Sequence, residues 1–467
     1  MQHVKQATNE LVLSDQQLLF IGKTFAHQLD FALNGCAGQT LQVFPTFIDQ
    51  IPQGTERGHF LALDLGGTNF RVLYIRLEGD RQSWLINQTY SVSQQLMKGR
   101  GEDLFDYIAS CLFNFVKENG LLNIKLKLGF TFSFPCKQTS RNQAVLTHWT
   151  KNFQVSGVVS RDIGEMLKCS IAKYENLDIE VAAILNDTTG TLISCAYQEP
   201  DCRMGVIIGT GVNICYMESH CLDKEMIINT EIGAFGSANH CLDFIRTRWD
   251  KQLDEGSLNV GQQLFEKMVS GMYLGEIVRT IVVDLMKAGI LSSQVFGAFT
   301  ARNSFTTSNI SCIELDSPTS ASFTHTKSVF ESMQISQASV DDCASLHLIC
   351  SRVSARSAHL VSAVIAALLN RMARRQTVIG VDGSVYRCHP HYKTIVNDKV
   401  GTLLPLYDSD DNSALVKHFR LMLSEDGSGR GAALIASLSA RPTYQGVQCE
   451  DCSRLGQIEC PTCVATA

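Results

Sequence analysis

The segment from Asp64 to Arg71 could bind a polyphosphate. It reads D-L-G-G-T-N-F-R and lies between two apolar stretches that read as strands. Adjacent glycines without Cβ atoms let backbone N–H groups approach phosphate oxygens, and the polar residues beside them add donors and a positive charge. The same residues also suit a plain β-hairpin, because Asn and Gly favour tight turns. The candidate ligands are Asp64, Gly66, Gly67, Thr68, Asn69 and Arg71.

A second glycine-rich bend, Gly209-Thr210-Gly211, follows a strand pattern that begins at Met204. The Thr210 hydroxyl lies between two glycines and could donate a hydrogen bond to a phosphate opposite the first turn. A simple hairpin bend would use the same residues, so the bend alone leaves both interpretations open. Thr210 and Gly211 are therefore candidate nucleotide ligands.

Asp187 is the candidate proton acceptor. It follows Asn186 at the carboxyl end of an apolar strand pattern, where open α/β sheets collect their ligands. A carboxylate there can accept a hydroxyl proton and so turn an alcohol into a nucleophile. The alternative is that Asp187 serves as the N-cap of a helix beginning at Thr188.

Periodic patterns predict the elements around these residues. Ser14 and Gln17 form a capping box before apolar residues at helical spacing, and Asn34-Gly35 ends that helix. Two phosphate-type hairpins, each followed by alternating strands and helices, indicate a duplicated α/β unit with mixed sheets. The other expected elements are strands at 60–63, 71–77, 126–134 and 179–185 and helices near 104–117 and 162–174.

Length and charge restrict the class of protein. A chain of 467 residues is too long for one compact core and suits two lobes with a ligand cleft between them. The net charge of −6, with no face rich in Lys and Arg, disfavours a nucleic-acid partner. The uncharged helical stretch 357–370 is too short to span a membrane and reads as a buried core helix, so we expect no transmembrane segment.

Cysteine usage and the N-terminal sequence predict a cytosolic protein. Four of the 17 cysteines crowd into residues 449–463, and the others are scattered without paired spacing. The scattered cysteines read as buried thiols in a reducing compartment rather than as a disulfide framework. The start, M-Q-H-V-K-Q-A-T-N-E, is polar and lacks the apolar core of a signal peptide.

Further motifs follow one another along the chain. They are L-G-F-T-F-S-F-P-C from Leu128, L-T-H-W-T-K-N-F from Leu146, I-L-N-D-T-T-G-T-L from Ile184, I-I-G-T-G-V-N from Ile207, I-N-T-E-I-G-A-F-G from Ile228 and L-S-E-D-G-S-G-R-G-A from Leu423. With the first turn they resemble the eukaryotic hexokinase and glucokinase family, in family order and spacing from about Ser14 to about Ala440. The resemblance is to the single-unit form of that family.

The resemblance implies an α/β fold, the two-lobed actin-like ATPase (ribonuclease H-like) fold, with mixed sheets and a cleft between the lobes. Residues 1–58, with the N-terminal helix, and residues 187–423 would form the large lobe. Residues 59–186 would form the small lobe, completed by a returning helix in 424–441. Residues 442–467 would be a Cys-rich tail outside the resemblance.

The family's activity is the ATP-dependent phosphorylation of a hexose, glucose most of all, at the 6-hydroxyl, as the first step of glycolysis. The resemblance makes Asp187 the general base for that hydroxyl and directs Lys151 to the transferring phosphoryl group and the sugar. Mg²⁺ bound to ATP is expected, with Asp64 as a ligand through water. The implied sugar contacts are Ser133, Thr150, Lys151, Asn186, Asp187, Asn213, Glu231 and Glu266. Besides the two glycine-rich turns, the nucleotide contacts are Thr307, Ser311, Gly383, Ser384, Gly427 and Ser428.

Three residues depart from the family pattern. Ile232 stands where the family usually has Trp, and Asn152 stands where it usually has Gly. Neither is a reacting group, so we expect catalysis to survive with altered packing of the sugar loops. Ser308 replaces a basic residue, which affects the expected nucleotide affinity.

The Cys-rich tail carries two C-x-x-C pairs beyond the resemblance. Four thiolates could bind tetrahedral Zn²⁺, but the loop between the pairs is shorter than in common zinc ribbons. A disordered, thiol-bearing tail is the alternative. The candidate ligands are Cys449, Cys452, Cys460 and Cys463.

Two other functions compete with a kinase. A catalytically impaired sugar sensor would keep the cleft and lose turnover, and the intact Asp187, Lys151 and phosphate turns argue against it. An actin-like or chaperone ATPase would leave the cluster of sugar-site residues unexplained. The expected partners are a hexose and ATP, and the chain is expected to be a monomer or a homodimer.

Overall fold

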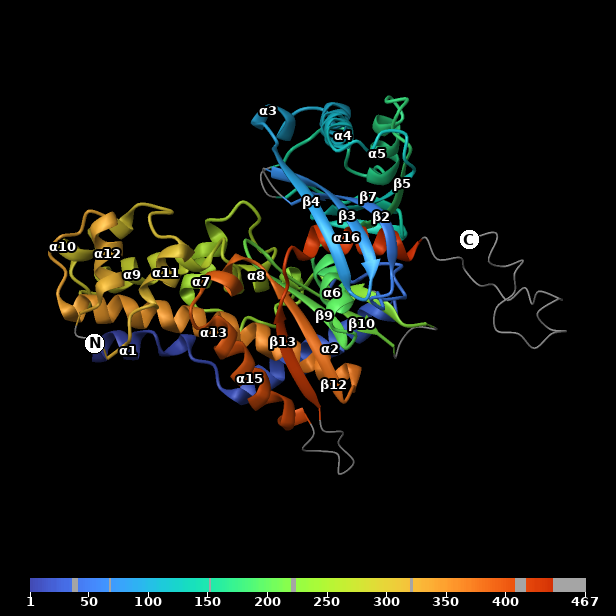
Figure 1. Ribbon diagram of the computed structural model, residues 1–467. Helices are drawn as coiled ribbons and strands as arrows, with labels where there is room; N and C mark the ends of the chain where they lie inside the picture. Colours follow the sequence, from blue (N-terminus) through green and yellow to red (C-terminus); the bar gives the residue numbers. More distant parts are fainter. Residues whose placement is uncertain are drawn as a thin grey trace.

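Two mixed β-sheets form the framework of the protein (Figure 1). The computed structural model describes residues 1–35, 41–66, 69–150, 153–219, 224–319, 322–407 and 417–439. The first sheet contains, in spatial order, β4 (Gln82–Ser91), β3 (Asn69–Gly79), β2 (Arg57–Leu65), β5 (Leu126–Phe132) and β8 (Ile179–Leu185). The second contains β1 (Phe44–Pro45), β11 (Met226–Asn229), β10 (Val212–Glu218), β9 (Cys202–Ile208), β12 (Gln376–Asp382) and β13 (His418–Leu423). A separate hairpin pairs β6 (Cys136–Ser140) with β7 (Gln143–Leu146).

The carboxyl ends of three strands meet at one edge of the first sheet. β2 and β3 form an antiparallel hairpin, whereas β5 runs parallel to both β2 and β8. The register pairs Leu65 with Phe132 and Thr131 with Leu185. The first glycine turn, Ser133 and the Asn186-Asp187 pair therefore follow strands that end side by side.

The second sheet repeats this arrangement. β9 and β10 form an antiparallel hairpin around the bend at Gly209–Gly211, and β12 runs parallel to both β9 and β13. Asp382 is paired with Ile207, and Val381 with Leu423. Each sheet thus has a hairpin whose first strand lies beside parallel strands, which confirms the predicted mixed sheets.

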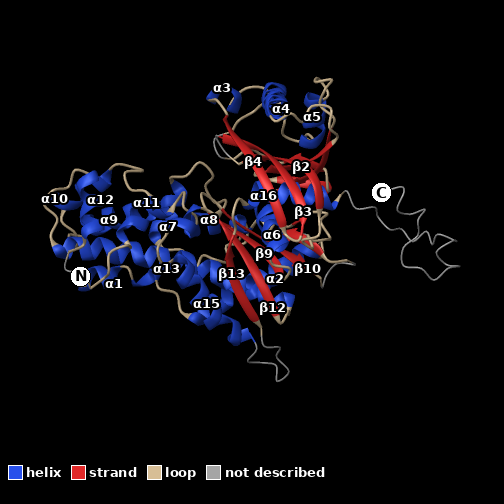
Figure 2. Ribbon diagram, in the orientation of Figure 1, coloured by secondary structure: helices blue, strands red, loops and turns tan. Residues whose placement is uncertain are grey.

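Helices cover both sheets (Figure 2). The first half of the chain contains α1 (Gln2–Ala7), α2 (Asp15–Leu33), α3 (Gln94–Met97), α4 (Gly101–Glu118), α5 (Ile163–Ile171) and α6 (Asp187–Gln198). The second half contains α7 (Arg248–Glu255), α8 (Leu264–Val269), α9 (Leu274–Lys287), α10 (Ser293–Phe296), α11 (Thr307–Ile313), α12 (Thr324–Ser332), α13 (Val340–Met372), α14 (Ser384–Cys388), α15 (Tyr392–Tyr407) and α16 (Gly427–Leu438). Short 3₁₀ turns are η1 (Asn9–Leu11), η2 (Ile232–Ala234) and η3 (Gly297–Thr300).

The first long helix, α2, forms as its sequence predicts. Ser14 and Gln17 make the reciprocal capping-box hydrogen bonds, and the helix ends at Asn34. Its predicted apolar stripe, which includes Leu18 and Phe25, is buried. The side chains of this stripe belong to the large core that also contains α13.

The helix α13 is the one described helix that is long and apolar enough to cross a membrane by length and composition. It contains the stretch 357–370, and 83% of its most apolar window is buried within the protein. Burial of this kind is also typical of a core helix in a large domain.

A shared core joins the two sheets. It contains side chains of β2, β3 and β8 from the first sheet and of β9, β10, β11 and β12 from the second, together with α6 and α16. Figure 1 shows α16 and α6 between the sheets. The two helices touch through backbone: a Cβ on Gly431 would lie only 2.1 Å from the Gly190 carbonyl oxygen. The last described helix thus packs against the helix that begins at Asp187, while the exact lobe boundaries stay a prediction.

The described cysteines agree with the predicted absence of a disulfide framework. Eleven of them are free thiols, and six of these are buried: Cys111, Cys195, Cys202, Cys215, Cys343 and Cys350. Burial in apolar surroundings raises the pKa of Cys215 to about 12, which keeps that thiol protonated.

Gly431→Ala should destabilise the protein, because the new Cβ would collide with backbone that cannot rotate away. Overpacking of this kind costs about 1–3 kcal/mol. Gly401→Ala is the matched control, since Gly401 is exposed within α15 and its new Cβ would meet nothing within 4 Å. Urea unfolding of both variants measures the difference. If Gly431→Ala is as stable as Gly401→Ala, α6 and α16 do not pack this closely.

Candidate active site

Helix α6 begins directly after β8 and carries two polar residues at its start. Asn186 is the N-cap: its Oδ1 accepts a hydrogen bond from the Thr189 N–H at 3.0 Å. The Asn186 Nδ2 is buried and has no acceptor among the described residues. Asp187 is the first helical residue, and its Oδ1 accepts from the Thr188 N–H at 2.9 Å. The N-cap alternative for Asp187 is therefore wrong, because Asn186 fills that position.

Two amides hold the carboxylate of Glu231 in the second sheet. Asn213 Nδ2 donates to Glu231 Oε1 at 3.2 Å and to Asn229 Oδ1 at 2.9 Å. Asn229 Nδ2 donates to the same Glu231 oxygen at 2.6 Å. Asn229 was not among the sequence candidates. Asn229 is the last residue of β11, two residues before Glu231, and this polar side chain close to a predicted ligand was the signal that could have found it.

Glu266 lies beside the second glycine bend. It is half-buried on α8, and its Oε2 accepts from the Val212 N–H at 3.1 Å. Burial raises the pKa of the nearby Tyr273 to about 12, with a further rise from the negative charge of Glu266. The carboxylate of Glu266 is therefore held against the bend by a backbone hydrogen bond.

The first sheet also contributes residues near these carboxylates. Ser133 is buried, and its N–H donates to the Leu65 carbonyl at 3.1 Å. Burial raises the pKa of the nearby Cys136 thiol, and the negative charge of Glu231 raises it further. Thr150 is half-buried in the loop after β7. Cys136, three residues after Ser133, therefore lies within electrostatic range of the Glu231 carboxylate.

Arg71 connects the first glycine turn to the start of α16. Its guanidinium pairs with Asp64 at 2.6 Å and with Asp426, and it donates to Ser428 Oγ at 3.2 Å. Ser428 Oγ in turn donates to Asp64 Oδ2 at 2.7 Å. Burial lowers the pKa of Arg71, but the two carboxylates outweigh it and raise that pKa above its ordinary value. Two carboxylates therefore balance the charge of Arg71, and its contact with phosphate stays a prediction.

Asp426 was not among the sequence candidates, although it lies in the S-E-D-G-S-G motif directly before Gly427. Gly427 is the first residue of α16, and Gly66 and Asn69 flank the undescribed part of the first turn. Asn69 is exposed at the start of β3. Among the described ligands predicted for this turn, Asp64 and Arg71 lie beside α16, because both are hydrogen-bonded to Ser428.

The second bend lies against the end of β12. Gly383 has a φ of +112°, and a Cβ there would lie 2.4 Å from the Ile208 backbone, so only glycine fits. A Cβ on Gly209 would lie 3.5 Å from the Ser384 N atom. Thr210 is exposed at the bend. The structure thus brings the predicted ligands of the bend together with Gly383 and Ser384.

Thr307 and Ser311 lie one turn apart on α11. Thr307 Oγ1 donates to the Gly271 carbonyl at 2.6 Å and accepts from the Gly275 N–H at 3.1 Å. Ser311 Oγ donates to the Thr307 carbonyl at 3.4 Å. Both hydroxyls are hydrogen-bonded within the protein, and their contact with a nucleotide stays a prediction.

Several sequence candidates lie outside the described residues. They are Gly67, Thr68, Lys151, Asn152, and the possible zinc ligands Cys449, Cys452, Cys460 and Cys463.

The two described departures from the family pattern have different surroundings. Ile232 is fully buried in η2, directly after Glu231, so its side chain packs into the core. Ser308 is exposed, and its hydroxyl is 2.7 Å from Thr306 Oγ1 at the start of α11. Ser308 therefore contributes no positive charge there.

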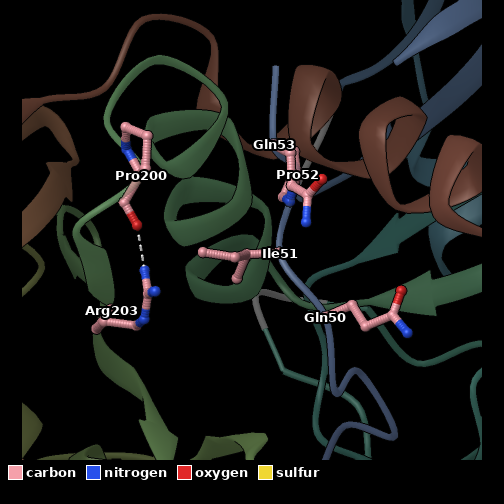
Figure 3. Close-up of a pocket in the computed structure, with 6 residues that line it drawn as sticks. All are labelled: Gln50, Ile51, Pro52, Gln53, Pro200 and Arg203. Atoms are coloured by element: carbon pink, nitrogen blue, oxygen red, sulfur yellow. Dashed lines mark hydrogen bonds between the residues drawn. The ribbon is translucent and has the colours of Figure 1, made fainter. Parts of the chain in front are cut away.

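A cavity of about 540 Å³ lies away from these residues. Gln50 to Gln53, in the segment before β2, line it with Pro200 from the turn after α6 and Arg203 from the start of β9 (Figure 3). The Arg203 guanidinium donates to the Pro200 carbonyl and so closes one side. None of the sequence candidates lines this cavity, so we place the candidate site at the strand ends.

Comparison with known proteins identifies the family. Two family models, both described as hexokinase, match residues 3–197 and 203–438. The chain belongs to the hexokinase family. Hexokinase-2 of Rattus norvegicus is 41% identical over 458 residues, and hexokinase-1 of Homo sapiens is 39% identical over 457 residues. Each alignment covers 94% of this chain and 48% of the relative, so the chain spans about half the length of the curated hexokinases it matches.

Solved hexokinases share the fold over their whole length. A structure titled hexokinase from Schistosoma mansoni complexed with glucose is 38% identical, with a TM-score of 0.83 over 94% of this chain and 98% of that one. A second, titled crystal structure of hexokinase, is 31% identical, with a TM-score of 0.81 over 94% of this chain and 99% of that one. The predicted two-lobed α/β kinase fold is confirmed.

Arg71→Met should lower the stability of this hexokinase-family chain by about 1–3 kcal/mol, because Asp64 and Asp426 would lose their shared partner. Arg76→Met is the control on the same strand, since the ion pair of Arg76 with Glu78 is half-exposed, and exposed pairs contribute about 0–1 kcal/mol. Urea unfolding compares the two. Equal stability of both variants would show that the Arg71 pairs do not fix α16 to the first turn.

Proposed function

We propose that this chain is a hexokinase that transfers the γ-phosphoryl group of ATP to the 6-hydroxyl of a hexose, with glucose the preferred sugar. The observation that carries the proposal is the Asn186-Asp187 pair at the start of α6. Asn186 offers a buried Nδ2 donor without an acceptor among the described residues, and the neighbouring Asp187 offers a carboxylate. A sugar hydroxyl both donates and accepts, so it suits this pair.

The remaining polar groups suit the rim of a pyranose. Glu231 and Glu266 supply carboxylate oxygens, each of which can accept hydroxyl hydrogen bonds. Asn213 and Asn229 orient Glu231 from within the sheet, and the Val212 N–H orients Glu266. Because these acceptors are held before a ligand arrives, binding would require little further ordering of side chains. The solved Schistosoma mansoni hexokinase with glucose supports glucose as the sugar.

Asp187 can act as the general base. It accepts the proton of the 6-hydroxyl while that oxygen attacks the γ-phosphorus, the bond to the β–γ bridging oxygen breaks, and ADP leaves. The first turn of a helix favours a negative charge, so the position of Asp187 suits a carboxylate. The catalytically impaired sensor gains no support from the described site, because Asp187 is in place.

The nucleotide would lie between the two glycine turns, with Mg²⁺ bound to its phosphates as part of the substrate. The described residues contain no group of three or more His, Cys, Asp or Glu that could hold a metal ion by itself. Phosphate oxygens are therefore the main ligands that we propose for Mg²⁺. Asp64 is the carboxylate of the first turn, and we propose that it binds Mg²⁺ through water.

The cellular setting is also part of the proposal. The free thiols of the described cysteines support a reducing compartment, and we place the protein in the cytosol. Hexose 6-phosphate formed there would enter glycolysis.

Asp187→Ala should reduce kcat on the order of 10² to 10⁴-fold, because the hydroxyl loses its proton acceptor. Glucose affinity should change much less, since Asn186, Glu231 and Glu266 remain. Asp201→Ala is the control, because Asp201 is an exposed carboxylate in the turn after the same helix. Coupled ADP release measures kcat, and calorimetry measures glucose binding. Near-normal kcat in a folded Asp187→Ala protein would overturn the general-base assignment.

A further inference from the structure

The segment between α8 and α9 connects a sugar-site residue to the second glycine bend. At its start, the Ser270 N–H donates to the backbone carbonyl of Glu266 at 2.8 Å. The next two residues then bind the bend: the Gly271 N–H donates to the Gly209 carbonyl at 2.8 Å, and the Met272 N–H donates to the Thr210 carbonyl at 3.2 Å. Backbone hydrogen bonds thus run from the helix of Glu266 to the phosphate candidates.

The bend is also held from its other side. The Glu266 carboxylate accepts from the N–H of Val212, the residue directly after Gly211. The same short helix therefore contacts the bend twice, once through the Glu266 side chain and once through the segment that follows it. A displacement of α8 on sugar binding would reach Gly209 and Thr210 along both contacts.

Thr307, on α11, also holds the segment between α8 and α9. Its hydroxyl proton is donated to the Gly271 carbonyl at 2.6 Å, and its oxygen accepts from the Gly275 N–H at 3.1 Å. One hydroxyl thus joins both ends of the turn 271–275 to the start of α11. A hydroxyl used in this way has no second proton to donate to a phosphate.

We propose that Thr307 is a positioning residue that couples sugar binding to nucleotide binding through residues 271–275. The proposal rests on the hexokinase activity proposed above and changes the role expected for Thr307 from a direct nucleotide ligand. With the hydroxyl in place, Gly271 is held between α11 and the carbonyl of Gly209, so α8 and the bend move as one body. Without it, the segment 271–275 is no longer fixed to α11, so only the Glu266–Val212 contact still joins α8 firmly to the bend, and the two sites lose part of their coupling free energy.

Thr307→Val and Thr307→Ser separate this role from simple packing. Valine keeps the shape and removes the hydroxyl, whereas serine keeps the hydroxyl and removes a methyl group. Calorimetry would measure the Kd of Mg²⁺ and adenosine 5′-(β,γ-imido)triphosphate with and without saturating glucose. In the unaltered chain and in Thr307→Ser we expect glucose to tighten analogue binding by about 5-fold or more. In Thr307→Val that factor should fall to within about twofold of one, while the Kd for glucose alone stays within about twofold.

Linkage supplies an internal check, because the analogue must tighten glucose binding by the same factor in each protein. A Thr307→Val protein that keeps the full factor would overturn the proposal, as would a Thr307→Ser protein that loses it equally. A factor near one in the unaltered chain would also overturn it. If Thr307→Val does not fold, Thr307→Ala removes the same hydroxyl without adding bulk and is judged by the same outcomes.

The two proposals fail in different ways. If the unaltered chain binds neither glucose nor the analogue, or does not phosphorylate a hexose, the proposed function fails and Thr307 loses its role with it. If the unaltered chain is an active hexokinase while the valine and serine variants behave alike, the coupling role of Thr307 fails and the proposed function stands.

Discussion

The backbone contact between α6 and α16 is the constraint on which the rest of the structure depends. No side chain separates Gly190 from Gly431, so the two helix axes are fixed relative to each other. Asn186 and Asp187 lie at the start of α6. Ser428 lies at the start of α16, where it contacts Arg71 and its ion pairs. A shift of either helix would therefore move the proposed proton acceptor relative to the first glycine turn. Because both helices also belong to the core shared by the two sheets, the same contact orients one sheet against the other.

Polar groups around the site are mostly held by other protein groups before any ligand binds. Two amides fix Glu231, a backbone N–H fixes Glu266, and two carboxylates surround Arg71. Pre-ordered groups lower the entropic cost of binding and place charge where a transition state needs it. Some buried polar atoms near the site have no hydrogen-bond partner among the described residues, and the Nδ2 donor of Asn186 is one of them. A buried donor in that condition is costly unless a ligand satisfies it, which is why we propose Asn186 as a sugar contact.

Much of this site could be predicted from the sequence, because its residues lie in continuous motifs at strand ends. The α2 helix followed from its capping box, and Asp187 followed from the end of β8. Arg71 and Asp426 could not be paired in this way, because they are 355 residues apart and meet only when α16 packs on the first sheet. Asn229 was missed because it acts through its hydrogen bond to Glu231. The strand β4 was missed because its half-exposed residues form no clear apolar run. The resemblance predicted that Thr307 contacts the nucleotide. Nothing in the sequence indicated that its hydroxyl is hydrogen-bonded to Gly271 and Gly275, because those contacts depend on the packing of α11.

Phosphorus-31 nuclear magnetic resonance of the purified chain with glucose and MgATP tests the proposed activity most directly. Transfer to the 6-hydroxyl predicts a phosphate ester signal coupled to the two protons on carbon 6 of glucose, in amounts equal to the ADP released. ADP with inorganic phosphate and no sugar ester, or an ester at another carbon, would contradict a hexose 6-kinase with Asp187 as its base.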